Sequence, residues 1–105
     1  MLKRLTRLCQ QHPGRFHVFG INWLRAINCL QPLLHSGDTS KWLDGARYRK
    51  LIFVHSRYHY LAEAPVRVLA KSMPGLASYD REQLCVENAR NMAQYAGCLP
   101  LPAAA

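Results

Sequence analysis

The residues with the widest chemical repertoire lie in the stretch Ala46–Tyr60, where cations, histidines and tyrosines flank an apolar centre at Leu51–Val54. Arginine suits phosphate, carboxylate and aromatic partners, and tyrosine rings stack on bases or anchor protein interfaces. The predicted binding residues come from the two flanking clusters and one upstream tryptophan: Trp42, Arg47, Tyr48, Arg49, Lys50, Arg57, Tyr58, His59 and Tyr60. Their types indicate a contact surface for a partner protein or a nucleic acid.

Catalysis and metal binding have little support in the residue pattern. His55 and His59 would share one face of a helix, but the chain lacks the repeated close Cys or His pairs typical of structural zinc sites. The six acids form no paired-carboxylate pattern, and the six glycines are scattered rather than gathered in a phosphate-binding loop. We therefore expect no catalytic residue, no metal and no cofactor.

The net charge of +8 is unevenly placed along the chain. Residues 1–57 contain ten Lys or Arg and two acids, whereas residues 58–105 contain four of each. A positive half of this kind suggests a polyanion, or an acidic face of another protein, as the partner. Direct contact with DNA or RNA would then come from residues 3–57.

Length and composition predict a single globular domain over residues 1–97, followed by a flexible tail at 98–105. With 105 residues, half of them apolar, the chain can bury a core without metal or disulfide. We expect no membrane span, because no apolar run approaches the roughly 18 residues that a membrane helix needs. The basic start has no apolar segment of a secretion signal after it, so we expect a cytoplasmic protein whose four cysteines are reduced thiols.

The elements that would position the binding residues have a mostly helical pattern. Apolar residues three and four apart, bounded by Pro, Gly and capping residues, predict helices at 2–12, 15–31, 40–62, 65–72 and 78–97. The third helix would carry all of Ala46–Tyr60, with Gly45 as its weak point. Ser78 is expected to cap the last helix and Gly97 to end it. The predicted fold is a compact, mostly α domain of four to five helices.

An α+β fold is the alternative that the pattern leaves open. The segment 16–19 reads as a short strand that stops at Gly20, and Leu51–Val54 consists of strand-forming residue types. In this alternative, residues 16–19 and 50–55 pair as a small two-stranded element.

These observations predict a small, basic, non-enzymatic regulator or inhibitor. It would bind a partner protein, part of a nucleic-acid-processing complex, through its basic and aromatic surface. A direct DNA- or RNA-binding protein is the first alternative. A small toxin-like ribonuclease is the second, since such enzymes can cleave RNA with Arg, Lys, His and Tyr alone, although their fold needs a multi-stranded sheet.

Overall fold

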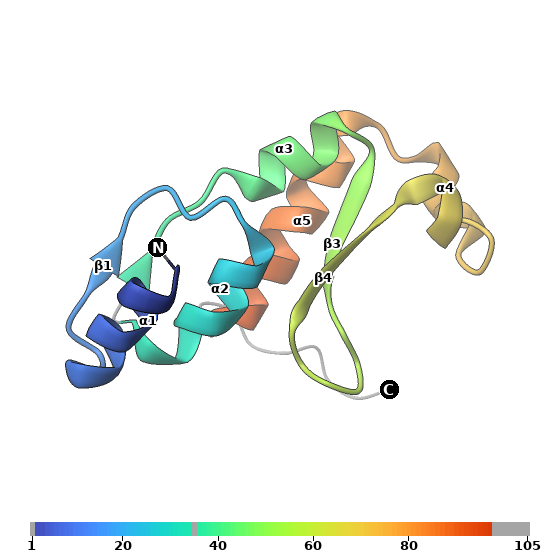
Figure 1. Cartoon of the computed structure of the whole chain (residues 1–105). Coiled ribbons are helices and arrows are strands. Elements are labelled where there is room, and N and C mark those ends of the chain that lie inside the picture. Colours follow the sequence, from blue (N-terminus) through green and yellow to red (C-terminus); the bar gives the residue numbers. More distant parts are fainter. Residues whose placement is uncertain (1, 35, 98–105) are drawn as a thin grey trace. The chain divides into compact units, whose positions relative to one another are not determined.

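The computed structural model describes residues 2–34 and 36–97 (Figure 1). The chain separates into two compact units, one within residues 1–41 (unit 1) and one within 42–105 (unit 2). The expectation of one domain over 1–97 stays a prediction, and the expected tail at 98–105 lies outside the described residues. In the described part of the chain, no helix is both long and apolar enough to span a membrane.

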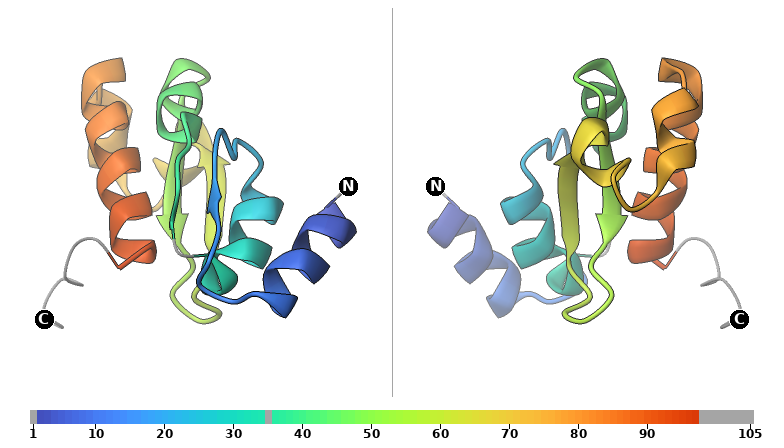
Figure 2. Two further views of the ribbon diagram at one scale, coloured as in Figure 1. Left: turned by 90° about the vertical axis from the view of Figure 1, so that its left-hand side faces the viewer. Right: turned by 90° about the vertical axis from the view of Figure 1, so that its right-hand side faces the viewer.

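Unit 1 combines two helices with a short parallel bridge. In chain order its elements are α1 (Leu2–Gln11), β1 (His17–Val18), α2 (Leu24–Leu30), the 3-10 helix η1 (Gln31–Leu33) and β2 (Ser36–Gly37). The first helix confirms the amphipathic pattern, and Cys9 is its buried residue. β1 pairs with β2 so that His17 lies opposite Ser36 and Val18 opposite Gly37. Figure 2 shows both helices of this unit from two sides.

The predicted helix at 15–31 is wrong over its first half. The helix begins only at Leu24, and Phe19, an apolar residue within the predicted range, is 79% exposed. Gly20 has a φ of +65°, which a right-handed helix does not contain. The side chain of Asn22 also accepts a hydrogen bond from the backbone of Ser40. These contacts outweigh the periodicity of the stripe, while the predicted end near residue 31, set by Pro32, is confirmed.

Unit 2 packs one long helix against a β-hairpin. Its elements are α3 (Lys41–Arg47), β3 (Lys50–Val54), β4 (Leu61–Pro65), α4 (Val66–Leu69), the 3-10 helix η2 (Pro74–Ser78) and α5 (Arg81–Tyr95). β3 and β4 are antiparallel, and α5 packs along β3 (Figures 1 and 2). The core is formed by Ala46, Leu51, Val66, Leu76 and Leu84, with Phe53, Leu69, Tyr79 and Cys85 packed against it.

The predicted helix at 40–62 is also wrong, since it ends at Arg47 and is followed by the hairpin. Arg49 breaks the helical path with a φ of +55°. Strands do occur within both segments of the α+β alternative, but β1 pairs with β2 and β3 pairs with β4. The described residues thus form five α-helices and two small two-stranded sheets, a helix-rich α+β arrangement.

Two asparagines of α5 hold the outer edge of β3. Asn88 is fully buried, and its Oδ1 accepts a hydrogen bond of 2.7 Å from the Ile52 amide. Its Nδ2 donates to the carbonyls of Lys50 (3.1 Å) and Trp42 (3.2 Å). Asn91, one helical turn further on, donates to the Ile52 carbonyl at 2.8 Å. Side chains therefore satisfy backbone groups that a neighbouring strand would otherwise satisfy.

Gly45 is a position of close packing rather than a weak point in a long helix. A Cβ atom at this position would lie 3.0 Å from Nδ2 of Asn88 and 3.2 Å from Cδ1 of Ile52. The approach of α3 to the buried asparagine therefore depends on the absence of a side chain at residue 45.

The long helix α5 has the cap type that the sequence suggested, but at another residue. Ser78 was expected to cap it, yet the Ser78 hydroxyl donates to the Gly75 carbonyl inside η2. The cap is Asp80, whose Oδ1 accepts from the Gln83 amide at 2.8 Å while Gln83 Oε1 accepts from the Asp80 amide at 2.9 Å. This is a reciprocal capping box. Gly97 follows the helix with a φ of +81°, as expected for its end.

Candidate functional site

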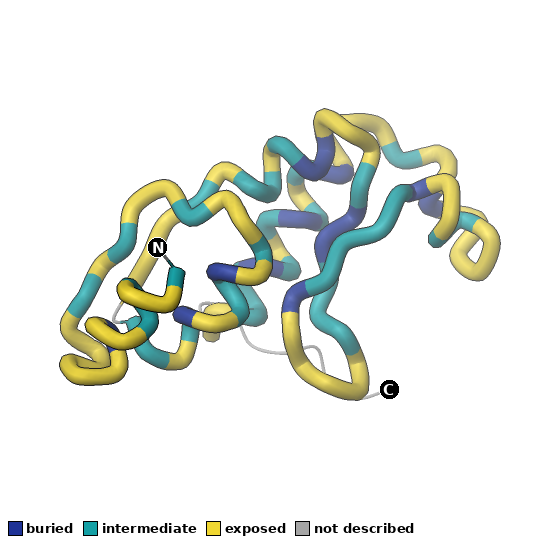
Figure 3. Tube along the Cα trace, in the orientation of Figure 1, coloured by how far each residue is buried: buried dark blue, intermediate teal, exposed yellow. Residues whose placement is uncertain are grey.

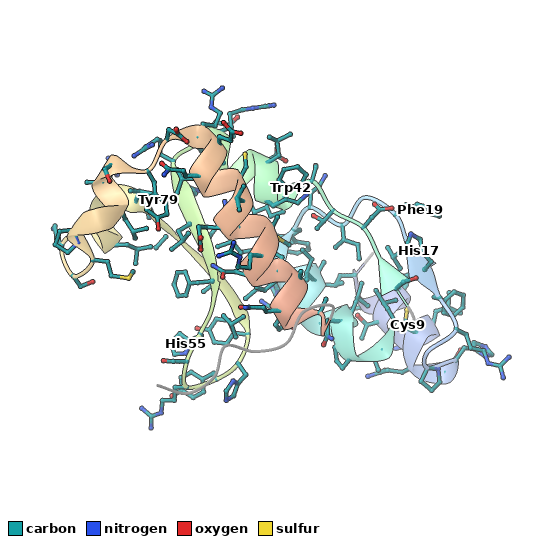
Figure 4. All side chains as sticks on the ribbon, turned by 180° about the vertical axis from the view of Figure 1, so that it is seen from behind. Cys9, His17, Phe19, Trp42, His55 and Tyr79 are labelled. Atoms are coloured by element: carbon teal, nitrogen blue, oxygen red, sulfur yellow. The ribbon has the colours of Figure 1, made fainter. Side chains whose placement is uncertain are left out.

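The hairpin divides the predicted binding residues into two groups. Arg47, Tyr48, Arg49 and Lys50 lie where α3 leads into β3, and Arg57, Tyr58, His59 and Tyr60 lie in the loop between β3 and β4. Five residues of strand separate the two ends, which is about 16 Å. Trp42 belongs to neither end, since it lies in the first turn of α3, and Figure 4 shows it well away from the loop residue His55.

The loop gathers three nearly parallel rings, which we call the loop cluster: His55, Tyr58 and Tyr60, with Arg57 beside them. The centroid of His55 lies 5.0 Å from that of Tyr60 and 5.2 Å from that of Tyr58, with interplanar angles of 10° and 26°. The guanidinium carbon of Arg57 lies 5.4 Å from the Tyr58 ring centroid. Tyr58 is 63% exposed and Tyr60 41% exposed, and Figure 3 shows the tip of this loop as exposed chain.

Hydrogen bonds within the loop fix these rings. The His55 amide donates to the Tyr60 carbonyl at 2.8 Å, and the His59 amide donates to the His55 carbonyl at 2.9 Å. The Nδ1 atom of His55 faces the amides of Arg57 (3.2 Å) and Tyr58 (3.3 Å). Nδ1 is therefore an acceptor, and the neutral ring carries its proton on Nε2. The loop cluster is held by contacts within six residues of chain.

The other end of the hairpin forms a groove of about 530 Å³, which we call the basic groove. It is lined by Tyr48, Arg49, Lys50, Pro65, Val66, Arg67, Ala70 and Ala77. Three of these residues are cations and none is an acid, and the Tyr48 ring is 70% exposed. Arg49 is anchored because its Nη1 donates to the Tyr79 carbonyl at 2.6 Å. The groove can therefore hold an anion beside an aromatic ring.

The local charge favours anions at both ends of the hairpin. Residues 45–62 contain four Lys or Arg and no Asp or Glu. Three of the five acids of this unit, Asp80, Glu82 and Glu87, line a separate depression near the start of α5. The other two are Asp44 in α3 and Glu63 in β4. A polyanion along the hairpin would meet attraction at its two ends, whereas the start of α5 would repel it.

No metal centre is formed by the part of the chain that the structure describes, since no three His, Cys, Asp or Glu side chains gather there. His55 and His59 lie in the hairpin loop and not on one face of a helix, so the spacing considered for them does not apply. The described cysteines Cys9, Cys29 and Cys85 are free thiols.

Two residues of these sites were not among the predicted binding residues. His55 is the centre of the loop cluster, and Arg67 supplies a cation to the basic groove. Both would have followed from a hairpin assignment, because antiparallel pairing places residue 55 opposite Tyr60 and residues just after 65 beside Lys50. Comparison with protein families, curated proteins and solved structures finds no match for this chain.

Proposed function

We propose that the hairpin of unit 2 binds single-stranded nucleic acid. The observation that carries the proposal is the loop cluster, where the exposed rings of Tyr58 and Tyr60 lie nearly parallel and the cation Arg57 lies over the Tyr58 ring. Bases stack on exposed aromatic rings, at about 1–3 kcal/mol per base, with little preference for sequence. The basic groove would take phosphates of the same strand at the other end of the hairpin.

Single strands fit this arrangement better than a duplex does. Ring faces can stack only on bases whose own faces are open, and in a duplex neighbouring base pairs cover them. The cations are few and lie at two points about 16 Å apart, instead of forming a broad basic face. DNA and RNA offer the same stacking and phosphate chemistry, so the proposal covers both.

The other functions predicted from the sequence remain predictions. A regulator that binds a partner protein would use the same tyrosines and arginines, since these residue types dominate interface hot spots. The ribonuclease alternative required a multi-stranded sheet, and the sheets in the described residues have two strands each. The exposed parallel rings favour nucleic-acid binding over both.

Fluorescence anisotropy with labelled oligonucleotides tests the proposal. A pyrimidine-rich single strand, as RNA and as DNA, is compared with its duplex at several salt concentrations. We expect the single strand to bind more tightly than the duplex. The three cations of the basic groove, together with Arg57, predict a slope of log K against log salt of about −3. The affinity should therefore fall roughly 50-fold between 50 and 200 mM salt.

Variants of the loop separate stacking from charge. Tyr58→Ala should weaken binding about tenfold with little change in the salt slope, whereas Tyr58→Phe keeps the ring and should bind normally. Arg90→Ala, an exposed position on α5, is the control for a lost cation. Equal binding by Tyr58→Ala and the wild type would overturn the proposal. Failure to bind any oligonucleotide, with recovery of one stoichiometric protein from nuclease-treated lysate, would favour the regulator instead.

A further inference from the structure

Unit 1 contains a hydrogen-bonded chain of serine, histidine and aspartate. The Ser36 hydroxyl lies 2.7 Å from Nδ1 of His17, and Nε2 of His17 lies 3.3 Å from Oδ2 of Asp38. The pairing of β1 with β2 creates this arrangement, because it sets His17 directly opposite Ser36 and brings Asp38 in just after β2. Residue 36 is distant from residue 17 in sequence, so sequence spacing alone gave no signal for the three side chains.

The protonation states of the three groups follow from their contacts. The Gly20 amide donates to Oδ1 of Asp38 at 2.6 Å. That hydrogen bond, together with His17, holds the pKa of Asp38 below its ordinary value of 3.8, so the carboxyl is charged at neutral pH. A charged Oδ2 takes the Nε2–H donor of His17, which leaves the Nδ1 lone pair facing the Ser36 hydroxyl. In the neutral form of the ring, His17 can therefore accept a hydrogen bond, and then the proton, from the Ser36 hydroxyl.

This is the arrangement that activates a serine nucleophile, with the roles of the two ring nitrogens exchanged relative to the serine-protease triad. The site is open to solvent, since the side chains of His17 and Asp38 are 36% and 56% exposed. The Phe19 ring packs edge-on against His17 with centroids 4.3 Å apart, and Figure 4 shows the two side by side. This exposed ring gives an apolar surface next to the base, as an aromatic ester would need.

We propose that Ser36, His17 and Asp38 form an acyl-transfer site for activated aromatic esters, independent of the hairpin. Ser36 Oγ attacks the ester carbonyl carbon and forms a C–O bond, while its proton passes to His17 Nδ1. The bond to the aryl oxygen then breaks, and the proton on His17 passes to the leaving phenolate or to water. Water next attacks the carbonyl carbon of acyl-Ser36 while His17 again accepts a proton. The bond to Oγ breaks, Oγ takes that proton, and the carboxylic acid leaves from the free serine. Ser36 and His17 are catalytic residues, and Asp38 is a positioning residue.

The reaction is tested with p-nitrophenyl acetate on the full chain, by the release of p-nitrophenolate and by mass spectrometry of the acetylated protein. An exposed site stabilises the developing oxyanion weakly, which is why an ester with a good leaving group is chosen. We expect an acetyl adduct on Ser36. Ser36→Ala should remove the adduct, and His17→Ala should slow its formation about 100-fold. Ser72→Ala and His12→Ala are the matched controls and should behave as wild type.

Asp38→Asn tests the positioning role separately. The asparagine retains an acceptor for Gly20, but its amide donates to Nε2 and moves the ring proton to Nδ1, where it blocks the base. We expect kcat to fall at least tenfold with KM unchanged, and Asp38→Glu to recover part of the loss. The adduct map of the wild type decides the case even where a variant misfolds. Acetylation that misses Ser36, or that proceeds equally in His17→Ala, would overturn the proposal and leave the three side chains as a clip between β1 and β2.

Discussion

The two ends of the β3–β4 hairpin are both basic and aromatic, but they are built in different ways. The loop cluster takes all its rings and its cation from residues 55–60. The basic groove is assembled from three separate segments: the entry to β3, the start of α4 and Ala77 in η2. One end is therefore set by local chain geometry and the other by the packing of unit 2.

The two ends should differ in how well they withstand a loss of packing within unit 2. The bonds that fix the rings run between residues no more than five apart, for example from the His55 amide to the Tyr60 carbonyl. The groove needs Arg49 held to the Tyr79 carbonyl, thirty residues away. Destabilising the contact between α5 and β3 should therefore affect the groove before the loop.

Asn88→Ala should have the largest effect on stability, and it tests the end of the hairpin that depends on packing. It leaves the Ile52 amide and the Lys50 carbonyl, which Asn88 now satisfies, without those partners. Each lost buried bond costs about 1–3 kcal/mol, so we expect the unfolding free energy to fall by about 3 kcal/mol. Urea unfolding measures it. Asn91→Ala, which removes one bond, is the graded control at about 1 kcal/mol, and equal midpoints for the two variants would contradict this account.

Combining substitutions at the two ends should show whether they act independently. Tyr58→Ala and the pair Arg49→Ala with Arg67→Ala should each weaken single-strand binding about tenfold, and together about 100-fold. Sites more than about 10 Å apart without shared partners usually add to within about 0.5 kcal/mol. Only the arginine pair should also reduce the salt slope. A coupling energy above about 1 kcal/mol, measured by anisotropy at fixed salt, would mean that the ends do not bind separately.

Glycine substitutions should have the smallest effect on stability, and their effects should differ between the two ends of the hairpin. Each end has one non-glycine residue in the left-handed region, Arg49 with φ +55° and His59 with φ +54°. A residue with a side chain costs roughly 1–2 kcal/mol when its backbone is in the left-handed region. Replacing it with glycine removes that cost, but the greater loss of backbone entropy on folding offsets about half of the gain. His59→Gly should therefore stabilise unit 2 by about 0.5 kcal/mol. Arg49→Gly loses the bond to Tyr79 and should not stabilise it, so a gain in the thermal midpoint for both would refute the distinction.

Elements with strong local signals were predictable from the sequence. The first helix has an unbroken amphipathic stripe, and α5 has capping residues before it and a glycine after it. Both form where local preference and tertiary contacts agree. The prediction at Ser78 missed the cap by two residues, because Ser78 and Asp80 are both competent caps and only η2 decides between them.

The hairpin was not predictable in the same way. Leu51, Val54, Tyr58 and Leu61 follow a helical spacing by coincidence. The segment instead forms β3, which pairs with β4 and is bound at Ile52 by Asn88, far along the chain. The residue types of the candidate site were therefore identified, but their arrangement at two separate ends was not. His55 and Arg67 were overlooked because their roles follow from strand register.

The asparagine pair on α5 has a consequence for how copies of this protein behave in crowded solution. An open strand edge offers its amides and carbonyls to a strand of another molecule, which is a common start of aggregation. At the centre of β3 those groups are occupied, because Asn88 and Asn91 bind both the amide and the carbonyl of Ile52. The apolar strand Lys50–Val54, rich in residue types that form fibrils, is thereby shielded on that edge by two polar side chains from its own helix.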